Sequence, residues 1–285
     1  SFFKQEVTNS SLKNSTKRNH LSTLMLLQEF KKDITFSDLT FEFVSSFEYF
    51  LQLKGYHTNT IAKHMKHLKR HVNIAINKEY IEIQKYAFRK YKIKTVENKH
   101  THLVPEELEK LEKLNLSGRY MKLQKSLDAF LFCCYAGMRY SDFTNLSSEN
   151  IVDINQETWL IYKSVKTGTE VRLPLYLLFA GKGIIILNKY RDNLEGFFRL
   201  RDNSNVNKDL LTLAKLAGLS KNISFHTARH TNATLLIYNG VNITTVQKLL
   251  GHKSVKTTQV YTNIMDMTII HDLEKMKQAT PFAGK

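Results

Sequence analysis

The second half of the sequence carries basic side chains and one tyrosine whose types could together break a phosphodiester bond. They are Arg139, Lys166, His226, Arg229, His252 and Tyr261. The two arginine forks match the non-bridging oxygens of a phosphoryl group and can neutralise the charge that builds in its transition state. Histidines can move protons, a lysine can protonate the leaving oxygen, and a tyrosine can attack phosphorus covalently. Because the phosphotyrosine formed is itself an ester, the cut strand could be rejoined without ATP.

Metal chemistry is poorly supported by these residues. Two-metal phosphodiester cleavage needs several carboxylate ligands, and none cluster around this set, so we expect no metal and no cofactor. His226 and His230 are four residues apart, as in a zinc protease helix. Such a helix needs a glutamate where Thr227 stands, and Arg229 would repel the dication. The adjacent Cys133 and Cys134 lie in an apolar run, and we interpret both as core residues of a reducing compartment.

Each residue also has a simpler explanation when it is taken alone. Arg139 could cap the helix before it, and His252 after Gly251 could end another. Tyr261 on an amphipathic helix could belong to the core. Lys166 could be an ordinary hairpin lysine, and Lys163 competes with it for the same role. The order and the flanking residues of all six therefore carry the interpretation.

In that order the residues resemble the tyrosine recombinase family, also called the phage integrase family. The family pattern is Arg, Lys on a β-hairpin, His-x-x-Arg, His or Trp, and Tyr, and the flanks agree as well. They are a Gly-x-Arg-x-Ser-(Asp/Glu) stretch at Gly137–Asp142, a second histidine after His-x-x-Arg, and Leu-Gly-His-x-Ser at Leu250–Ser254 before Thr-Thr-x-x-Tyr. Met138 and Ala228 stand where leucine is usual. The resemblance covers about residues 105–277 by motif.

The resemblance implies a mainly α fold: an N-terminal helical, SAM-like core-binding domain and an α-rich catalytic domain with a small antiparallel β-sheet. It also implies a site-specific recombinase that integrates or excises a mobile element, as an integrase or transposase does. Cleavage would pass through a 3′-phosphotyrosine and a Holliday junction on double-stranded DNA. Arg139, Arg229 and His252 would stabilise the transition state, His226 would act as acid/base or phosphate ligand, and Lys166 would be the general acid.

Family members assemble as dimers to tetramers on DNA, and a helix after the tyrosine docks into a neighbouring protomer. Residues 267–277 are the candidate for that helix, with apolar anchors Ile269, Ile270, Leu273 and Met276. The chain starts at Ser1 without a methionine, which fits a fragment or processed form that lacks an upstream arm-binding domain. The expected location is the bacterial cytoplasm, at the nucleoid, with no membrane partner.

Two alternatives fit many of the same residues. A type IB topoisomerase shares the chemistry but relaxes supercoils without a special site. A catalytically silent, sequence-specific DNA-binding protein would use the scaffold without strand transfer. The complete set of six residues argues against the second alternative.

The charge indicates where DNA would be bound. Of the net charge of +16, residues 1–50 contribute nothing, while residues 51–100 hold 12 basic and 3 acidic side chains, a net of +9. A polyanionic partner is the usual reason for such a surface, with nucleic acid ahead of an anionic membrane. We place the core-binding domain at 1–90, a basic linker at 91–104 and the catalytic domain at 105–285. Pro105, followed by two glutamates, marks a helix start.

The N-terminal part is predicted to be helical. A helix from about Thr60 places Ile61, Met65, Leu68, Val72 and Ile76 on one face. Its other face carries no acid, and we predict that it contacts DNA together with the linker, rather than being only a solvated face. The predicted DNA-binding residues are Lys63, Lys66, His67, Arg70, Asn73, Lys92 and Lys94.

The remaining elements must position the six residues. Asp38 is the predicted N-cap of a helix that ends near Gly55. Segments 158–162 and 171–175 read as strands that flank a turn containing Lys166. Helices are predicted at roughly 105–115, 121–137, 176–191, 207–217, 227–239, 243–250, 256–264 and 267–277. Only 3 prolines and 11 glycines argue against a many-stranded β-protein.

Overall fold

The computed structural model describes residues 1–97 and 100–261. The chain divides into two compact units, Ser1–Asn98 and Lys99–Lys285. The boundary falls inside the basic segment 91–104, and both ends of that segment are packed. Tyr91 is buried and donates a hydrogen bond from its hydroxyl to Glu48 at 2.6 Å. Leu103 at the other end is fully buried. The predicted linker 91–104 is therefore packed against a unit at each of its two ends.

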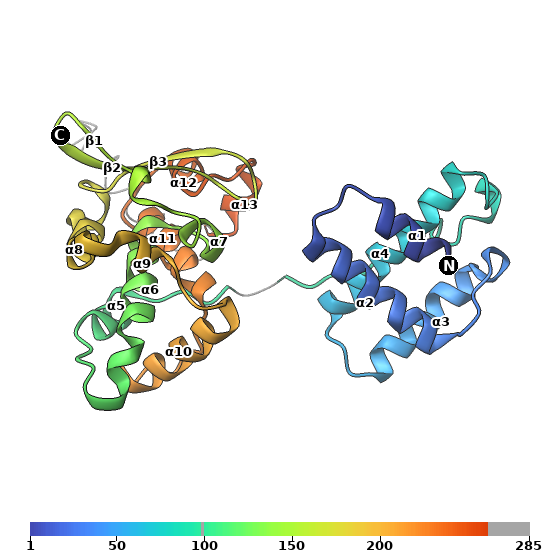
Figure 1. Ribbon diagram of the computed structural model, residues 1–285. Coiled ribbons are helices and arrows are strands. Elements are labelled where there is room, and N and C mark those ends of the chain that lie inside the picture. Colours follow the sequence, from blue (N-terminus) through green and yellow to red (C-terminus); the bar gives the residue numbers. More distant parts are fainter. Residues whose placement is uncertain (98–99, 262–285) are drawn as a thin grey trace, which may run out of the picture. The chain divides into compact units, whose positions relative to one another are not determined.

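The N-terminal unit is built from helices, as predicted (Figure 1). Their bounds are α1 Phe2–Asn9, α2 Asn14–Phe30, α3 Phe41–Leu53 and α4 Thr58–Asn77. The prediction that Asp38 caps α3 is wrong, because Thr40 accepts the hydrogen bond from Phe43 N. Asp38 accepts hydrogen bonds from Thr35 and Lys31 instead. Gly55 follows α3 with φ +75°, as a helix stop requires.

Helix α4 has a wider buried face than its apolar residues predict. Ile61, Met65, Leu68 and Val72 are buried as expected, and Ile76 is half-buried. His64 and His71 are buried beside them, where α4 packs against α2. Polar rings inside a core need hydrogen-bond partners, and Thr23 and His20 of α2 supply them to His64 and His71, respectively.

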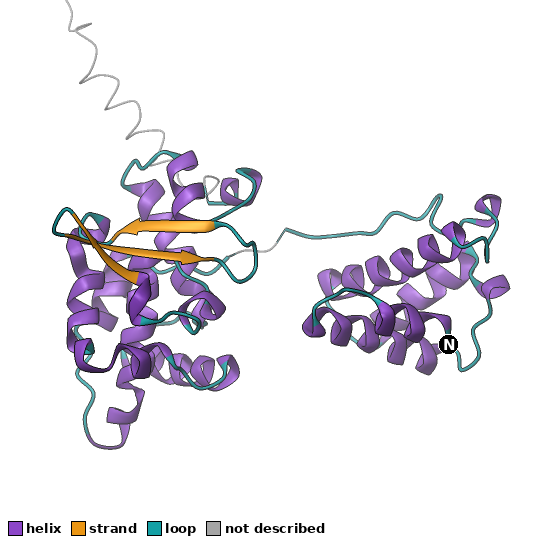
Figure 2. Cartoon of the chain, turned by 45° about the horizontal axis from the view of Figure 1, so that its top comes forward, coloured by secondary structure: helices purple, strands orange, loops and turns teal. Residues whose placement is uncertain are grey.

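The second unit surrounds a small sheet with helices (Figures 1 and 2). The strands β1 Ile151–Ile154, β2 Glu157–Lys163 and β3 Glu170–Pro174 pair antiparallel in that order. Leu160 lies opposite both Ile151 and Leu173, which fixes the register. Strands β2 and β3 confirm the predicted hairpin. The four-residue β1 has no signal of its own in the sequence.

The helices of this unit follow the predicted order. Their bounds are α5 Pro105–Glu112, α6 Gln124–Ala136, α7 Tyr140–Phe143, α8 Lys182–Lys189, α9 Leu194–Phe198, α10 Asn203–Leu216, α11 Phe225–Tyr238, α12 Ile243–Leu250 and α13 Lys256–Gln259. Helices α6 and α11 pack against each other and are buried along most of their length. Cys133 and Cys134 lie inside α6 as fully buried free thiols.

Some helix bounds differ from the prediction. The helix predicted at 176–191 starts only at Lys182, because Phe179 and Ala180 adopt φ values of +49° and +54° that no helix allows. Residues 118–123 before α6 form a 3₁₀ turn. The predicted helix at 267–277 lies outside the described residues. Within those residues, no helix combines the length and the apolar character needed to cross a bilayer.

Candidate active site

Two helix ends bring the predicted residues within reach of one another. Helix α6 ends at Gly137 and α12 ends at Gly251, both in the left-handed conformation. A Cβ at Gly137 would lie 2.6 Å from Asn232 Oδ1, and one at Gly251 would lie 2.6 Å from Val171 Cγ2. Only glycine fits either position, since both the conformation and the space exclude a side chain. The two sharp turns end α6 just before Arg139 and α12 just before His252.

Arg229 on α11 ties these two turns together. Its side chain is 1% exposed, and it donates from Nη1 to Gly137 O at 2.7 Å and from Nη2 to Leu250 O at 2.5 Å. A guanidinium has five N–H donors, so others remain for a phosphate. Burial first, and the charge of Arg139 second, lower the pKa of Arg229 to about 10. It stays a cation at neutral pH and is held in place by the backbone.

Arg139 is positioned by a buried acid. Its Nη1 donates to Ser164 Oγ at 3.2 Å and lies 3.5 Å from Asp142 Oδ2. The Asp142 side chain is fully buried and accepts a hydrogen bond from Val165 N at 2.9 Å. One carboxylate thus holds Arg139 and the start of the β2–β3 loop. The sequence interpretation gave Asp142 and Ser164 no role, although an acid three residues after the arginine was a usable signal.

The β2–β3 loop places Lys166 near the histidines. Thr167 donates from Oγ1 to Gly251 O at 3.3 Å, next to His252. The charge of Lys166 contributes to lowering the pKa values of His226 and His252. Lys163 instead lies opposite Glu170 in the strand ladder. The geometry therefore favours Lys166 over Lys163.

His226 and His252 are neutral imidazoles in the absence of DNA. Burial, followed by the charges of Arg229 and Arg139, lowers the pKa of His226 to about 4 and that of His252 to about 3. His252 Nδ1 also hydrogen-bonds Thr258 Oγ1 at 2.9 Å. A bound anion would offset the arginine charges and raise both pKa values.

Tyr261 reaches the same site from the end of the described chain. It is 4% exposed, and its hydroxyl hydrogen-bonds His230 Nδ1 at 3.0 Å. Burial raises the pKa of the phenol, while Arg229 and Arg139 act in the opposite direction. His230 was noted in the sequence only as a flanking residue. The structure thus brings all six predicted residues to one region of the second unit.

No metal site accompanies this arrangement in residues 1–97 and 100–261. There, no three or more His, Cys, Asp or Glu side chains are grouped so that they could hold an ion. The cations of the site are side chains. The arrangement can bind a phosphodiester, neutralise its developing charge and present a phenol to it.

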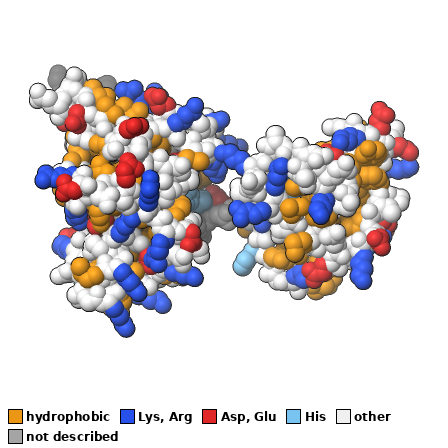
Figure 3. Space-filling model, in the orientation of Figure 1, with side chains coloured by type: hydrophobic (Ala, Val, Ile, Leu, Met, Phe, Trp, Pro, Cys, Tyr) orange, Lys and Arg blue, Asp and Glu red, His pale blue; other side chains and the backbone are white. Residues whose placement is uncertain are grey.

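The predicted DNA-binding residues lie mostly on one exposed face of the N-terminal unit. Lys63, Lys66, Arg70 and Asn73 are exposed on α4, and Lys92 and Lys94 are exposed beyond it. His67 differs, because its ring is half-buried and its Nδ1 hydrogen-bonds Thr23 Oγ1 at 2.8 Å. Figure 3 shows Lys and Arg side chains spread over both units on the face it presents.

Residues of the basic segment cover the start of α4. Asn59 pairs with the backbone of Val96, donating to its carbonyl at 2.8 Å and accepting from its amide at 3.0 Å. A shallow groove of about 490 Å³ runs here. Its lining is Asn59, Ala62, Lys63, Lys66, His67, Thr95 and Val96. Two lysines in a groove of that size suit a phosphate backbone.

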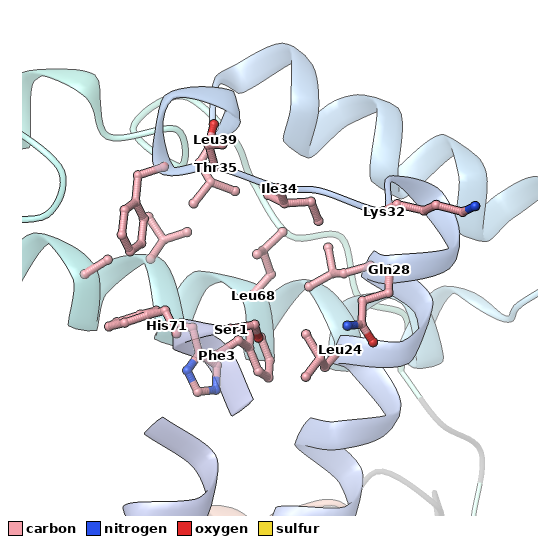
Figure 4. Close-up of a pocket in the computed structure, with 15 residues that line it drawn as sticks. Ser1, Phe3, Leu24, Gln28, Lys32, Ile34, Thr35, Leu39, Leu68 and His71 are labelled. Carbon is pink, nitrogen blue, oxygen red and sulfur yellow. The ribbon is translucent and has the colours of Figure 1, made fainter. Parts of the chain in front are cut away.

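One cavity of the N-terminal unit lies away from this chemistry. It measures about 430 Å³ and is mostly apolar (Figure 4). His71 stacks with Phe3 at its wall, with ring centroids 3.7 Å apart. None of the six predicted catalytic residues lines it. The cavity therefore does not compete as the active site.

Comparison with known proteins agrees with this geometry. Residues 102–267 match the phage integrase family, and residues 1–93 match the phage integrase SAM-like domain. A tyrosine recombinase of Pseudothermotoga lettingae is 31% identical over 62% of this chain and 60% of its own length. Tyrosine recombinase XerD of Oceanobacillus iheyensis is 26% identical over 88% of this chain and 86% of its own length.

Two solved structures share the fold. A lambda integrase (75–356) dimer bound to a COC′ core site has a TM-score of 0.74 at 19% identity, covering 91% of this chain and 92% of that one. The Tn1549 transposon integrase (82–397, Y379F) in complex with transposon right end DNA has a TM-score of 0.73 at 18% identity, covering 98% of each chain. The similarity extends over both units, so the helical unit and the catalytic unit occur together in these proteins.

Proposed function

Because the chain belongs to the phage integrase family, we propose that it is a site-specific DNA recombinase that cuts and rejoins double-stranded DNA through Tyr261. The observation that carries the proposal is the convergence of two cationic arginines and a buried tyrosine on one site. Arg229 bridges the turns that precede Arg139 and His252, and Tyr261 lies within the electrostatic reach of both arginines. Its relatives are tyrosine recombinases, which does not favour the topoisomerase or the silent binding protein.

The proposed reaction balances without a cofactor. Tyr261 Oη attacks the scissile phosphorus and loses its proton, so that a P–O bond forms to the protein as the bond to the 5′-oxygen breaks. Lys166 gives the leaving oxygen its proton. Arg139, Arg229 and His252 hold the non-bridging oxygens. His226, as the acid/base, takes the proton that the Tyr261 hydroxyl loses, and it can also donate a hydrogen bond to the phosphate. The reverse reaction with the 5′-hydroxyl of another strand completes the exchange.

DNA binding and assembly follow the same proposal. Residues 1–90 would grip the duplex through Lys63, Lys66, Arg70 and Asn73, with Lys92 and Lys94 on the segment 91–104. Protomers would assemble on DNA as dimers to tetramers and resolve a Holliday junction, as the lambda integrase structures bound to such DNA suggest. The likeness to a transposon integrase supports a mobile element as the context, in the bacterial cytoplasm at the nucleoid.

A covalent-trapping assay tests the proposal. A duplex site is first selected by binding to the protein from a random library, and then rebuilt with a nick near the cut so that the released fragment is lost. The wild type should give a protein–DNA adduct on a denaturing gel, and Tyr261→Phe should give none. Failure of the wild type on every selected site, or an adduct with Tyr261→Phe, contradicts the mechanism. Relaxation of a plasmid that lacks the site would favour the topoisomerase.

A further inference from the structure

The segment that enters the catalytic unit is fixed to helix α11 beside the nucleophile. Leu103 N donates to Thr231 Oγ1 at 3.0 Å, and Leu103 is fully buried. Lys221 Nζ donates to His102 O at 3.1 Å. Thr231 follows His230 directly in α11. The backbone of residues 102–103 is therefore anchored one residue away from the partner of Tyr261.

The same segment places an imidazole on that partner. The ring of His100 stacks on the ring of His230, with centroids 4.4 Å apart and planes tilted by 27°. His230 Nδ1 lies 3.0 Å from the Tyr261 hydroxyl. We propose that His100 is a positioning residue for the nucleophile, which acts by holding the His230 ring in the orientation that binds the Tyr261 hydroxyl. This inference rests on the proposed function.

Orientation, rather than proton transfer, is what His230 can supply. Burial, and then the nearby His226, His100, Arg229 and His102, lower the pKa of His230 to about 3. Burial raises the pKa of the Tyr261 phenol above its usual value of about 10. Moving the proton from the Tyr261 phenol to His230 is thus strongly disfavoured. A neutral His230 accepts a hydrogen bond and fixes the direction of the phenol.

The stacked rings also explain why the hydrogen bond between His230 and Tyr261 depends on the segment that carries His100. One face of the imidazole can be covered by a flat ring without using its nitrogens, so Nδ1 stays available to the phenol. His226 meets the His230 ring edge-on, with ring centroids 4.5 Å apart. Removal of the His100 ring would leave His230 free to turn about its side-chain bonds.

Three variants of the full chain test this inference in single-turnover cleavage of the trapping substrate. We expect His100→Ala to slow adduct formation by about three- to tenfold, the range that one aromatic pair supports. His100→Phe retains a flat ring and should restore the rate. His102→Ala is the matched control on the same segment and should cleave like the wild type. DNA affinity should be the same for all of them.

A double-mutant cycle shows whether His100 acts through His230. His230→Ala should slow cleavage, and adding His100→Ala should slow it no further. Multiplying effects, equal rates for His100→Ala and the wild type, or equal losses in His100→Ala and His100→Phe would overturn the inference. A wild type that forms no adduct contradicts the proposed function instead, so the two failures are distinguishable.

Discussion

Each unit of the molecule holds a cluster of histidines, and the two clusters differ in what surrounds them. The N-terminal cluster is His20, His64, His67 and His71, and the catalytic cluster is His226, His230 and His252. Burial lowers the pKa values of His64, His67 and His71 to about 4, close to the values in the catalytic cluster. A depressed pKa therefore marks burial in both places, and does not by itself identify the active site.

The partners separate the two clusters. In the N-terminal unit, Thr23 Oγ1 hydrogen-bonds His64 and His67, each at 2.8 Å, and His20 Nδ1 hydrogen-bonds His71 Nε2 at 3.1 Å. Thr23 of α2 thus serves two rings of α4 and His20 serves a third, while the buried His71 Nδ1 has no hydrogen-bond partner. The catalytic histidines lie near Arg139 and Arg229, whose positive charges would stabilise a bound phosphate. The comparison predicts that one cluster controls stability and the other controls chemistry.

The largest expected effect is on cleavage, from the arginines of the catalytic cluster. Arg229→Lys should reduce the single-turnover rate by about 10²–10³, because one ammonium cannot replace the guanidinium fork. Arg229 also holds two carbonyls of the fold, so Arg139→Lys is the second variant. Arg139→Lys should reduce the cleavage rate by a similar factor, while its circular dichroism spectrum and its DNA affinity stay unchanged. Cleavage within threefold of the wild type by Arg139→Lys would contradict the role of the arginine pair.

Low pH should protonate the histidines of both clusters, whereas bound DNA should change the pKa values mainly in the catalytic cluster. Their folded pKa values lie below the unfolded value of about 6.5, so the stability that the neutral rings contribute is complete above pH 6.5 and is lost as the pH falls toward 4. Urea unfolding at pH 7 and pH 5 measures that loss.

NMR titration of the rings should show that a bound duplex raises the pKa of His226 and His252 by one unit or more. The pKa values of His64 and His71 should change less, and equal shifts in both clusters would break the comparison.

A smaller effect should follow from the hydroxyl that links the N-terminal cluster. Thr23→Val leaves two imidazole nitrogens without their partner and should lower the free energy of unfolding by about 1–3 kcal/mol. Thr234→Val is the matched control, since the buried Thr234 hydroxyl has no hydrogen-bond partner. Urea unfolding should find the control as stable as the wild type or more so. A cleavage rate of bound DNA reduced tenfold by Thr23→Val would give this cluster a catalytic part.

No effect is expected from removal of divalent metal. The positive charge that faces the phosphate comes from Arg139 and Arg229, which need no ion to hold it. Cleavage in excess EDTA should therefore match cleavage in magnesium within a factor of two. A tenfold loss in EDTA, restored by added magnesium, would show that the arginine pair does not carry the charge alone.

Much of the site could be predicted because its residues lie in short local motifs. The spacing of His226 and Arg229, and the glycines before Arg139 and His252, are sequence features with local meaning. The strands around Lys166 followed from their composition. Asp142 was named only as part of a motif, and its contact with Ser164 was missed, because that contact joins positions 22 residues apart through a buried carboxylate. No local pattern specifies such a pair.

The same dependence on contacts between distant residues explains why the prediction for α4 was incomplete. Its apolar periodicity correctly predicted the buried face, but it gave no sign that His67, predicted for the DNA face, also contacts the packed side of the helix. Only the packing of α2 against α4 puts Thr23 beside that ring. A polar side chain at the border between the buried and the exposed face of a helix can lie on either face. The neighbouring helix determines which, by offering or not offering a hydrogen-bond partner.

The sequence by itself determined the chemistry: a tyrosine nucleophile, two arginines, a hairpin lysine, and a basic helical unit to hold DNA. Residue type and local spacing are sufficient for that, because charge, acidity and helix ends are properties of short segments. The tertiary structure decided which groups hold the nucleophile and which histidines face a phosphate. Those outcomes depend on long-range contacts, such as His100 on His230 and Arg229 on two distant carbonyls, which exist only after the chain has packed.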